Sequence, residues 1–299
     1  MTDLSSYFAR IPALAGAEGA RAVRLGGLTN LNYLIDHDDQ RFVLRVPGAG
    51  TGEYVDRAAE LVAATVASDA DVNAELVFFD PSDGLMVTRF VERARTMDAG
   101  AFADLEAVGR AGEVFRRLHT CPTPFTTDFQ LFPMIDEYKS LLAAKGATLP
   151  PGYEQVQRQA DTTRARLERS PGTLVPSHCD PLCENFLDTG SRMYLIDYEY
   201  AANNDPMWDL GDLSVEAGFE PEQDAALFRA YFGNEPADEQ VGRMVAYKAM
   251  CDLLWTLWGV IQHINQNPAE DFWAYAMGRF DRCQALLNSD DYPTFIAAI

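Results

Sequence analysis

Four polar residues in the second half of the chain have the types and the spacing needed to transfer a phosphoryl group. They are His178, Asp180, Asn185 and Asp197, and the last of them follows a short apolar run. An aspartate such as Asp180 can accept a proton from an alcohol, and the oxygens of Asn185 and Asp197 are the hard ligands that Mg²⁺ prefers. The order H-x-D-x-x-x-x-N with a later aspartate is typical of phosphotransferases. We therefore predict that His178 and Asp180 are catalytic and that Asn185 and Asp197 bind the metal.

The residues between Asn185 and Asp197 predict a β-hairpin that brings these two side chains together. Apolar runs at 186–187 and 193–196 are separated by the Asp-Thr-Gly-Ser turn at 188–191. A turn of this kind between two apolar runs is a hairpin signal. Because the two strands of a hairpin run side by side, its first and last residues become neighbours, and two oxygen ligands then face one site.

Ser177, His178 and Asp180 could also suggest a Ser-His-Asp hydrolase, but their spacing excludes it. The members of such a triad converge from separate elements, whereas near-adjacent residues on one strand cannot line up side chain to side chain. The chain also has no G-x-S-x-G sequence, which would mark a nucleophile elbow. Phosphoryl transfer is therefore the better interpretation.

Composition and charge limit the classes of partner. The 299 residues carry a formal net charge of −21, and lysine occurs only at positions 139, 145 and 248. Such an acidic surface repels nucleic acid and anionic lipid and attracts cations. There is no run of about 18 uncharged apolar residues and no apolar leader after a basic start, so we expect neither membrane insertion nor secretion. Five irregularly spaced cysteines are typical of reduced thiols, which favours a cytoplasmic location.

The first ninety residues predict a small lobe built on β-strands. Short apolar runs there end at turns rich in glycine, proline and aspartate, which is the pattern of strands in a sheet. One alanine-rich segment, which contains Glu60, predicts a helix among them. The expected strands cover residues 22–25, 31–35, 41–46, 75–79 and 85–91, and the expected helix covers 54–67.

After residue 91 the apolar residues recur at spacings of three and four, which predicts helices. The clearest of these cover 101–119, 131–145 and 152–168. A five-stranded lobe with one helix, followed by helices, the catalytic hairpin and more helices, is the order of elements in protein kinases. We therefore predict an α+β, protein-kinase-like bilobal fold. Its small β-rich N-lobe (1–91) would bind nucleotide, and its larger, mostly helical C-lobe (92–299) would carry the catalytic and substrate-binding residues.

This fold predicts where a nucleotide binds. A cation on the third strand contacts the phosphates and pairs with a carboxylate on the helix, and Arg45 and Glu60 occupy these positions. The guanidinium fork suits phosphate, although arginine and lysine do not exchange freely. The Gly-Gly turn at 26–27 would cover the phosphates with its backbone N–H groups, and the segment 88–92 would meet adenine. The predicted nucleotide-binding residues are Gly27, Thr29, Asn30, Arg45, Glu60, Phe90 and Val91.

These motifs together resemble the choline/ethanolamine kinase family, particularly its bacterial members, within the superfamily related to aminoglycoside phosphotransferases. The match covers most of the chain. It includes L-R-V-P-G from Leu44, I-D-Y-E-Y-A from Ile196, W-D-L-G-D from Trp208, W-x-x-W-x-x-x-Q from Trp255 and Y-A-x-x-R-F from Tyr275. The H-x-D…N signature alone is shared with aminoglycoside, thiamine and homoserine kinases, whereas the paired tryptophans and the D-Y-E-Y run are more specific. The resemblance implies ATP as the phosphoryl donor and Mg²⁺ as its metal.

Together with this resemblance, the tryptophan motif predicts a site for a quaternary ammonium group, whereas the apolar residues around it would by themselves indicate a plain core helix. On a helix, Trp255 and Trp258 fall on one face. A trimethylammonium group is held by aromatic faces and nearby carboxylates, at about 0.5–2 kcal/mol per contact. The resemblance implies that Glu216 is the acidic residue near the cation. It also implies another aromatic residue soon afterwards, where this chain has Phe219 and then Glu-Pro-Glu, which leaves room for ethanolamine or another small amino alcohol. The predicted substrate-binding residues are Tyr200, Glu216, Trp255, Trp258 and Tyr275.

The sequence therefore predicts a cytoplasmic, ATP-dependent kinase that phosphorylates the hydroxyl of a small cationic alcohol. Choline, which would give phosphocholine and ADP, is the leading assignment. A kinase for ethanolamine, thiamine or an aminoglycoside is an alternative of the same class. A pseudokinase that only binds a cation or a nucleotide is an alternative of a different class, and the presence of Asp180, Asn185 and Asp197 disfavours it. No oligomeric state follows from the sequence.

Overall fold

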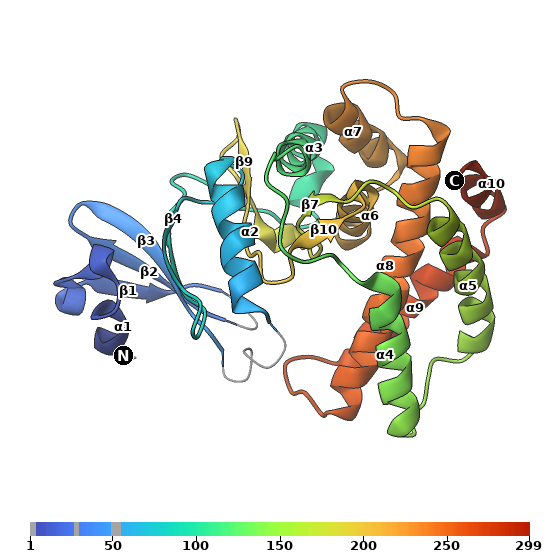
Figure 1. The fold of residues 1–299 in the computed structure, drawn as a ribbon, viewed down its shortest axis with the longest axis horizontal. Helices are drawn as coiled ribbons and strands as arrows, with labels where there is room; N and C mark the ends of the chain where they lie inside the picture. The colour runs from blue at the N-terminus through green and yellow to red at the C-terminus, as the bar shows by residue number, and fades with distance from the viewer. Residues whose placement is uncertain (1–3, 27–29, 49–54) are drawn as a thin grey trace.

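The chain folds into a small lobe dominated by a β-sheet and a larger lobe dominated by helices, as expected for a protein-kinase-like α+β fold. Figure 1 shows the sheet at one end of the molecule and the helices at the other. The computed structural model describes residues 4–26, 30–48 and 55–299. The predicted fold class is confirmed.

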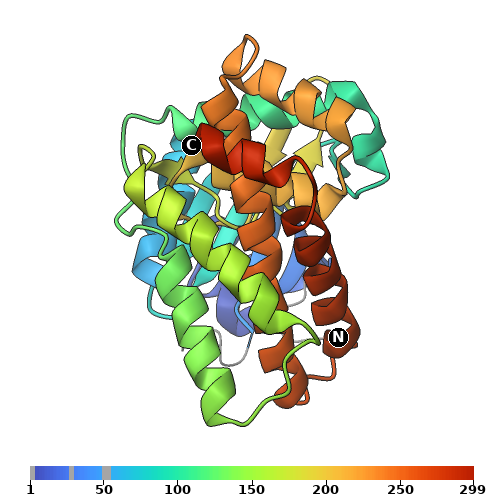
Figure 2. The same cartoon turned by 90° about the vertical axis from the view of Figure 1, so that its right-hand side faces the viewer.

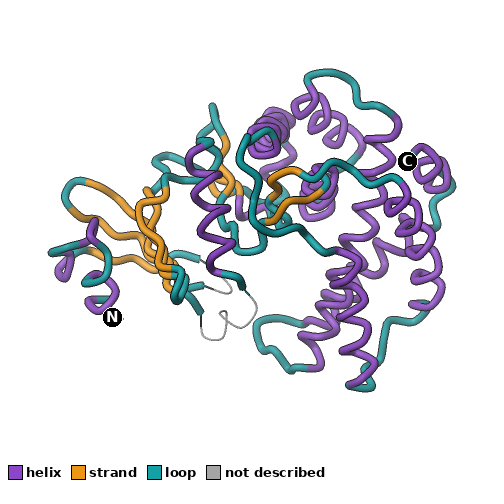
Figure 3. The backbone as a smooth tube through the Cα atoms, in the orientation of Figure 1, coloured by secondary structure: helices purple, strands orange, loops and turns teal. Residues whose placement is uncertain are grey.

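The N-lobe sheet has five antiparallel strands in the order β1-β2-β3-β5-β4, visible in orange in Figure 3. The predicted strands are all present, with ends that differ by one or two residues. Their inward side chains, such as Ile35, Leu44 and Val87, are fully buried and form a separate N-lobe core with the N-terminal segment that begins at Leu4. The strands are β1 (Arg21–Arg24), β2 (Leu31–His37), β3 (Gln40–Val46), β4 (Leu76–Asp80) and β5 (Leu85–Arg89).

Helix α2 (Arg57–Asp69) lies between this sheet and the C-lobe in Figure 1. It begins at Arg57, and the expectation of a start at residue 54 was wrong. Asp56 explains the difference, because its side chain accepts hydrogen bonds from the backbone N–H groups of Ala58 and Ala59, both at 3.0 Å. An aspartate in this position caps the first turn and fixes where the helix starts.

The C-lobe is built around the long helix α8 (Asp238–Ile264). Figure 2 shows α4, α5 and α9 gathered around it. By length and composition α8 could cross a membrane, but 78% of its most apolar window is buried inside the protein, so it is the core helix of this lobe. The other helices are α3 (Leu105–His119), α4 (Leu131–Ala144), α5 (Tyr153–Arg169), α6 (Pro206–Ala217), α7 (Pro221–Phe232), α9 (Phe272–Leu287) and α10 (Tyr292–Ala298).

The predicted helix over 101–119 is divided in two. A short 3₁₀ turn covers Ala101–Ala103, and α3 begins only after Asp104. The Asp104 side chain accepts a hydrogen bond from the N–H of Glu106 at 3.0 Å and so caps the start of α3.

Two small sheets lie on the side of the C-lobe that faces α2 (Figure 1). One pairs β6 (Arg95–Thr96) with β8 (Phe186–Asp188) and β8 with β9 (Met193–Leu195). The other pairs β7 (Val175–Ser177) with β10 (Ala202–Asn204). The β8–β9 pair is the predicted hairpin, and its register sets Phe186 opposite Leu195.

Candidate functional site

The segment from His178 to Asp180 is fixed by a buried carboxylate of α6. Asp209 accepts hydrogen bonds from the backbone N–H groups of His178 at 2.7 Å and Cys179 at 2.8 Å. The Trp208 indole N–H donates to the Cys179 carbonyl at 3.1 Å. Cys179 has a φ of 68°, in the left-handed region that non-glycine residues rarely adopt. These three hydrogen bonds hold that conformation and so set the direction of Asp180.

The His178 ring is fully buried and acts through its neighbours. Its Nε2 lies 2.9 Å from the carbonyl oxygen of Ile196. Burial lowers the pKa of His178, so the ring is neutral and its Nε2–H donates to this carbonyl. His178 therefore joins the segment that carries Asp180 to the one that carries Asp197; this contact favours a positioning role, and the catalytic role expected for His178 stays a prediction.

The hairpin brings Asn185 and Asp197 together. The backbone N–H of Ile196 donates to the carbonyl of Asn185 at 2.9 Å. The Asn185 side chain donates from Nδ2 to the carbonyl of Asp180 at 3.1 Å, so its amide oxygen is the atom that remains to bind a cation. Asp197 has a φ of 72°. Both predicted metal ligands thus lie beside the segment that carries Asp180.

The predicted ion pair of the N-lobe is present. Arg45 Nη1 lies 2.5 Å from a Glu60 carboxylate oxygen, and both side chains are buried. The same nitrogen lies 3.4 Å from Asp197 Oδ1. Arg57 Nη1 donates to the other Glu60 oxygen at 2.6 Å and lies 3.7 Å from Glu199. Two arginines from the small lobe therefore face carboxylates from both lobes.

The carboxylates in this region suit a hard divalent cation. Oxygen atoms of Glu60, Asp197 and Glu199 lie within 4.8 Å of one another. Burial raises the pKa of Asp197, and Arg45 opposes this shift. Burial and the charge of Asp197 raise the pKa of Glu199. Closely spaced carboxylates that resist ionisation are stabilised by a bound cation, and oxygen donors of this kind are the ligands that Mg²⁺ takes.

Asp180 interacts electrostatically with this group and with a second acidic region, which consists of Asp212 and Glu216 on α6. Burial, and then the charges of Glu216, Asp197 and Glu199, raise its pKa to about 8, and Arg279 opposes the shift. A carboxyl group with a pKa near the working pH suits proton transfer. A strongly shifted carboxyl with charged neighbours is also typical of functional sites.

Four aromatic rings of α8 and α9 form a cluster near the second acidic region. Trp258 contacts the rings of Trp255, Phe272 and Tyr275, with centroids 5.9, 5.5 and 5.7 Å away and interplanar angles of 71–88°. Trp255, Trp258 and Tyr275 are half-buried, so part of each side chain stays accessible. We refer to Trp255, Trp258, Phe272 and Tyr275 as the aromatic cluster.

Arg279 connects the aromatic cluster to Glu216. Its guanidinium forms an ion pair with the Glu216 carboxylate and lies 5.0 Å from the centroid of the Tyr275 ring. Burial raises the pKa of Tyr275, and the charges of Glu216 and Asp180 add to the shift. Glu216, Tyr275 and Asp180 therefore share one electrostatic environment.

For the remaining predicted nucleotide-binding residues the structure gives fewer contacts. Gly27 and Thr29 lie outside the described residues. Asn30 is buried and donates from Nδ2 to Glu199 at 3.2 Å. The N–H of Phe90 donates to the Arg41 carbonyl at 3.0 Å, so adenine would have to meet other backbone groups of this segment, such as the N–H of Val91.

Tyr200 is half-buried at the end of the segment that follows Asp197, and its role in substrate binding stays a prediction.

Several residues of the site were not predicted. Arg57 had a signal, since it lies three residues before Glu60 on the same helix. Asp209 lies in an apolar helical run, where a fully buried aspartate indicates hydrogen-bonded backbone nearby. Phe272 and Arg279 lie three residues before and four after Tyr275, which places all three on one face of α9.

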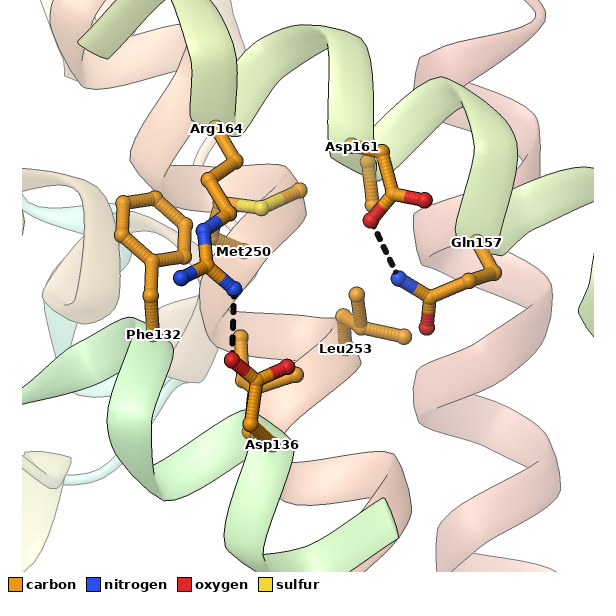
Figure 4. Close-up of a pocket in the computed structure, with 9 residues that line it drawn as sticks. Phe132, Asp136, Gln157, Asp161, Arg164, Met250 and Leu253 are labelled. Carbon is orange, nitrogen blue, oxygen red and sulfur yellow. Dashed lines mark hydrogen bonds and ion pairs between the residues drawn. The ribbon is translucent and has the colours of Figure 1, made fainter. Parts of the chain in front are cut away.

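A hollow shown in Figure 4 lies away from this site, between α4, α5 and α8. Arg164 closes one side by an ion pair with Asp136 at 2.7 Å, and Gln157 donates to Asp161 at 2.6 Å. Its accessible volume of about 10 Å³ is comparable to one water molecule. It is too small for an alcohol or a nucleotide.

Comparison with known proteins identifies what this arrangement is similar to. Residues 21–245 match the phosphotransferase enzyme family. A choline/ethanolamine kinase family protein from Mesorhizobium loti is 48% identical, with a TM-score of 0.91 over 99% of both chains. Choline kinase LicA from Streptococcus pneumoniae is 28% identical, with a TM-score of 0.75 over 89% of this chain and 92% of its own. A LicA structure in complex with AMP is 27% identical, with a TM-score of 0.72 over 90% of this chain and 91% of its own.

Proposed function

This chain belongs to the phosphotransferase enzyme family and, within it, to the choline/ethanolamine kinases, and we propose that it transfers the γ-phosphoryl group of ATP to the hydroxyl of a small cationic alcohol. Choline is the substrate we expect, with phosphocholine and ADP as products. The observation that carries the proposal is the position of Asp180, which interacts electrostatically with the carboxylates around Arg45 on one side and with Glu216 on the other. One group of residues suits phosphates and the other suits a cation.

The N-lobe would bind the nucleotide. Arg45 and Arg57 provide two buried guanidinium groups, which can contact phosphate oxygens once the nucleotide is present. The complex of LicA with AMP supports a nucleotide site in a protein of this fold and 27% identity. Gly27, Thr29 and Asn30 would cover the phosphates, and the backbone around Phe90 and Val91 would meet adenine.

Asn185 and Asp197, with Glu199 nearby, would hold Mg²⁺, which when bound neutralises charge on the phosphates. The chain's own residues then have separate tasks. Asp209 and His178 keep the catalytic segment in place, and Asp180 orients the substrate hydroxyl and accepts its proton. The hydroxyl oxygen forms the new bond to the γ-phosphorus as the bond to the bridging oxygen of ADP breaks. Placement and charge supply most of the rate enhancement.

The aromatic cluster and Glu216 would recognise the cationic end of the substrate. Trp258 and Tyr275 offer ring faces, which attract an ammonium group without needing N–H donors. The name of the Mesorhizobium relative and that of the LicA structure support this substrate class. Choline and ethanolamine have only two carbons between nitrogen and oxygen, so this proposal requires the cation to bind within that short distance of Asp180, and the electrostatic interaction between Asp180 and Glu216 supports it.

The proposal is tested by steady-state turnover with Mg²⁺ and ATP on choline, ethanolamine, thiamine and an aminoglycoside. We expect the highest kcat/KM with choline. Asp180→Asn should lower kcat by about 10²- to 10⁴-fold, because it removes the proton acceptor while keeping the shape. Asp136→Asn, which changes an exposed carboxylate of α4, is the matched control and should leave kcat within twofold. Equal kcat in Asp180→Asn and the wild type would refute the role of Asp180.

A further inference from the structure

A second carboxylate lies behind Glu216. Asp212 is one helical turn earlier on α6, and oxygens of both side chains lie within 4.8 Å of each other and of the Cys251 sulfur on α8. Asp212 is 1% exposed. Its Oδ1 accepts a hydrogen bond from the Cys251 thiol at 2.9 Å. Its Oδ2 is buried and has no hydrogen-bond partner among the residues that the structure describes.

The charges around Asp212 are not balanced. Glu216 has the guanidinium of Arg279, and Asp252 has Arg279 at 3.3 Å and Arg282 at 2.7 Å. Asp212 has no arginine or lysine within ion-pair distance in the described part of the chain. A buried carboxyl without a cation or a full set of donors is costly, and such groups are normally paired. Burial and the charges of Glu216 and Asp180 accordingly raise the pKa of Asp212.

A buried donor without a partner lies in the same region. The indole N–H of Trp255 belongs to the aromatic cluster, one helical turn after Cys251, and finds no acceptor among the described residues. Most buried polar groups in native proteins are hydrogen-bonded, so an exception needs an explanation. The unsatisfied acceptor of Asp212 is explained by a cationic guest that carries an N–H bond, whereas the indole N–H of Trp255 needs an acceptor, which an ammonium group does not offer.

We propose that Asp212 is a second carboxylate for the substrate's ammonium group and that it favours ammonium groups carrying at least one N–H bond, while choline is still accepted through its charge. This inference rests on the proposed kinase function and deepens it. A trimethylammonium group brings a charge but no donor, so it leaves Oδ2 of Asp212 without a hydrogen bond. Ethanolamine and its mono- and dimethyl derivatives supply that bond. The substrates are then the whole methylation series, not choline alone.

The test measures kcat/KM of the wild type and of Asp212→Asn with ethanolamine, N-methylethanolamine, N,N-dimethylethanolamine and choline. The last two substrates differ by one N–H. We expect the wild type to use dimethylethanolamine at least as well as choline. A hydrogen bond to a charged group is strong, so Asp212→Asn should lose about tenfold or more on the three N–H substrates and less than threefold on choline. Cys251→Ala, which keeps the carboxylate, should preserve the wild-type order.

Each other outcome is decisive. An equal effect of Asp212→Asn on all four substrates, or none on any, overturns the proposal. If the variant does not fold, the wild type alone decides, since a tenfold preference for choline over dimethylethanolamine would also overturn it. If the wild type phosphorylates none of the four alcohols, the proposed function fails, and the role of Asp212 fails with it. Turnover of the alcohols in which the effect of Asp212→Asn does not depend on N–H count leaves the kinase function intact and rejects the role of Asp212 alone.

Discussion

At the scale of single residues, the protonation of Asp180, the proton acceptor that we propose, depends on its surroundings. Asp180 lies among carboxylates on both sides, and these charges together with burial raise its pKa to about 8. The free enzyme at neutral pH therefore holds Asp180 mostly in its protonated form. A cation near Glu216 or Asp197 would favour the carboxylate instead.

The pH dependence of kcat/KM should report this carboxyl group. Because the pKa is raised and the base must be ionised, kcat/KM measured with both substrates below saturation, which reports the free enzyme, should rise about tenfold per pH unit below pH 8 and level off above it. Among the charged neighbours, Glu216 has the largest effect on the pKa of Asp180, so Glu216→Gln should move the rising limb of the profile to lower pH. Rate profiles between pH 5.5 and 9.5 measure both effects. A flat wild-type profile, or an upward move in the variant, would contradict the assignment.

Trp258 should contribute to substrate binding more than to the chemical step. It contacts three rings of the aromatic cluster, and loss of one cation–aromatic contact is worth about 0.5–2 kcal/mol. Trp258→Ala should therefore raise the KM for choline by about 3- to 30-fold with kcat changed much less. Trp273→Ala is the matched control, since Trp273 lies on α9 but packs against His263. An unchanged KM in Trp258→Ala would remove the aromatic cluster from the substrate site.

At this scale the sequence predicts those residues that are marked by their spacing to neighbours close in the chain. Asn185 and Asp197 follow from a hairpin, and Arg45 and Glu60 from the order of strands and helix. Asp212 could not be found this way, because an acidic residue in a helical run looks like an exposed one until α8 is known to cover it. The partner of His119 was equally hidden, since its Nε2 lies 3.0 Å from Asp209, ninety residues further along the chain.

At the scale of elements, α6 and α8 determine the shape of the site. Helix α6 anchors the catalytic segment through Asp209 and supplies Asp212 and Glu216 from the same element. Helix α8 supplies Trp255 and Trp258 and contacts α9 closely. Gly259 permits this contact, because a Cβ there would lie 2.8 Å from Tyr275 Cδ1 and 3.1 Å from Ala276 Cβ.

Gly259→Ala should therefore push α9 away from α8 and disturb Tyr275. Overpacking of this kind lowers the free energy of unfolding by about 1–3 kcal/mol. We also expect a higher KM for choline. Gly278→Ala is the matched control on α9, because a Cβ there meets nothing within 4 Å. It should stabilise the helix by up to about 1 kcal/mol. Urea unfolding and choline kinetics of both variants decide; equal behaviour would show that the α8–α9 contact yields without cost.

The elements that could not be predicted from the sequence are short, or pair with strands far away in the chain. Periodicity identifies long amphipathic helices, but β7 and β10 have three residues each and pair across a gap of more than twenty. Nothing local marks that pairing. Helix starts were missed for another reason: Asp56 and Asp104 cap α2 and α3, and a capping side chain takes precedence over the apolar pattern that extends beyond it.

At the scale of the whole molecule, the net charge of −21 should assist a cationic substrate. Long-range attraction speeds the encounter of opposite charges and is screened as the Debye length falls from about 10 Å at 0.1 M salt to about 3 Å at 1 M. At saturating ATP and Mg²⁺, kcat/KM for choline should fall by about 3- to 10-fold between 20 mM and 500 mM salt. The KM for the anionic nucleotide complex, measured alongside, should not rise. A salt-independent kcat/KM for choline would show that the surface charge has another role.

The two-lobed order was the most predictable feature, because a run of strands followed by a run of helices needs no knowledge of contacts. The contacts between the lobes were not predictable in detail. Arg45 reaches Asp197 and Arg57 reaches Glu199 across more than 140 residues of sequence.

Strand β5 ends at Arg89 and β6 of the hairpin sheet begins at Arg95, so residues 90–94 join the two sheets there, and the first of them still donates from its N–H to the Arg41 carbonyl. Arg93 within them has a φ of 59°. Because this connection is short and lies between two hydrogen-bonded sheets, it is a suitable crossover point for chimaeric proteins. Chimaeras that splice the first lobe of one relative to the second lobe of another at 90–94 would keep both sheets whole. They would let donor preference and acceptor preference be recombined as separate parts.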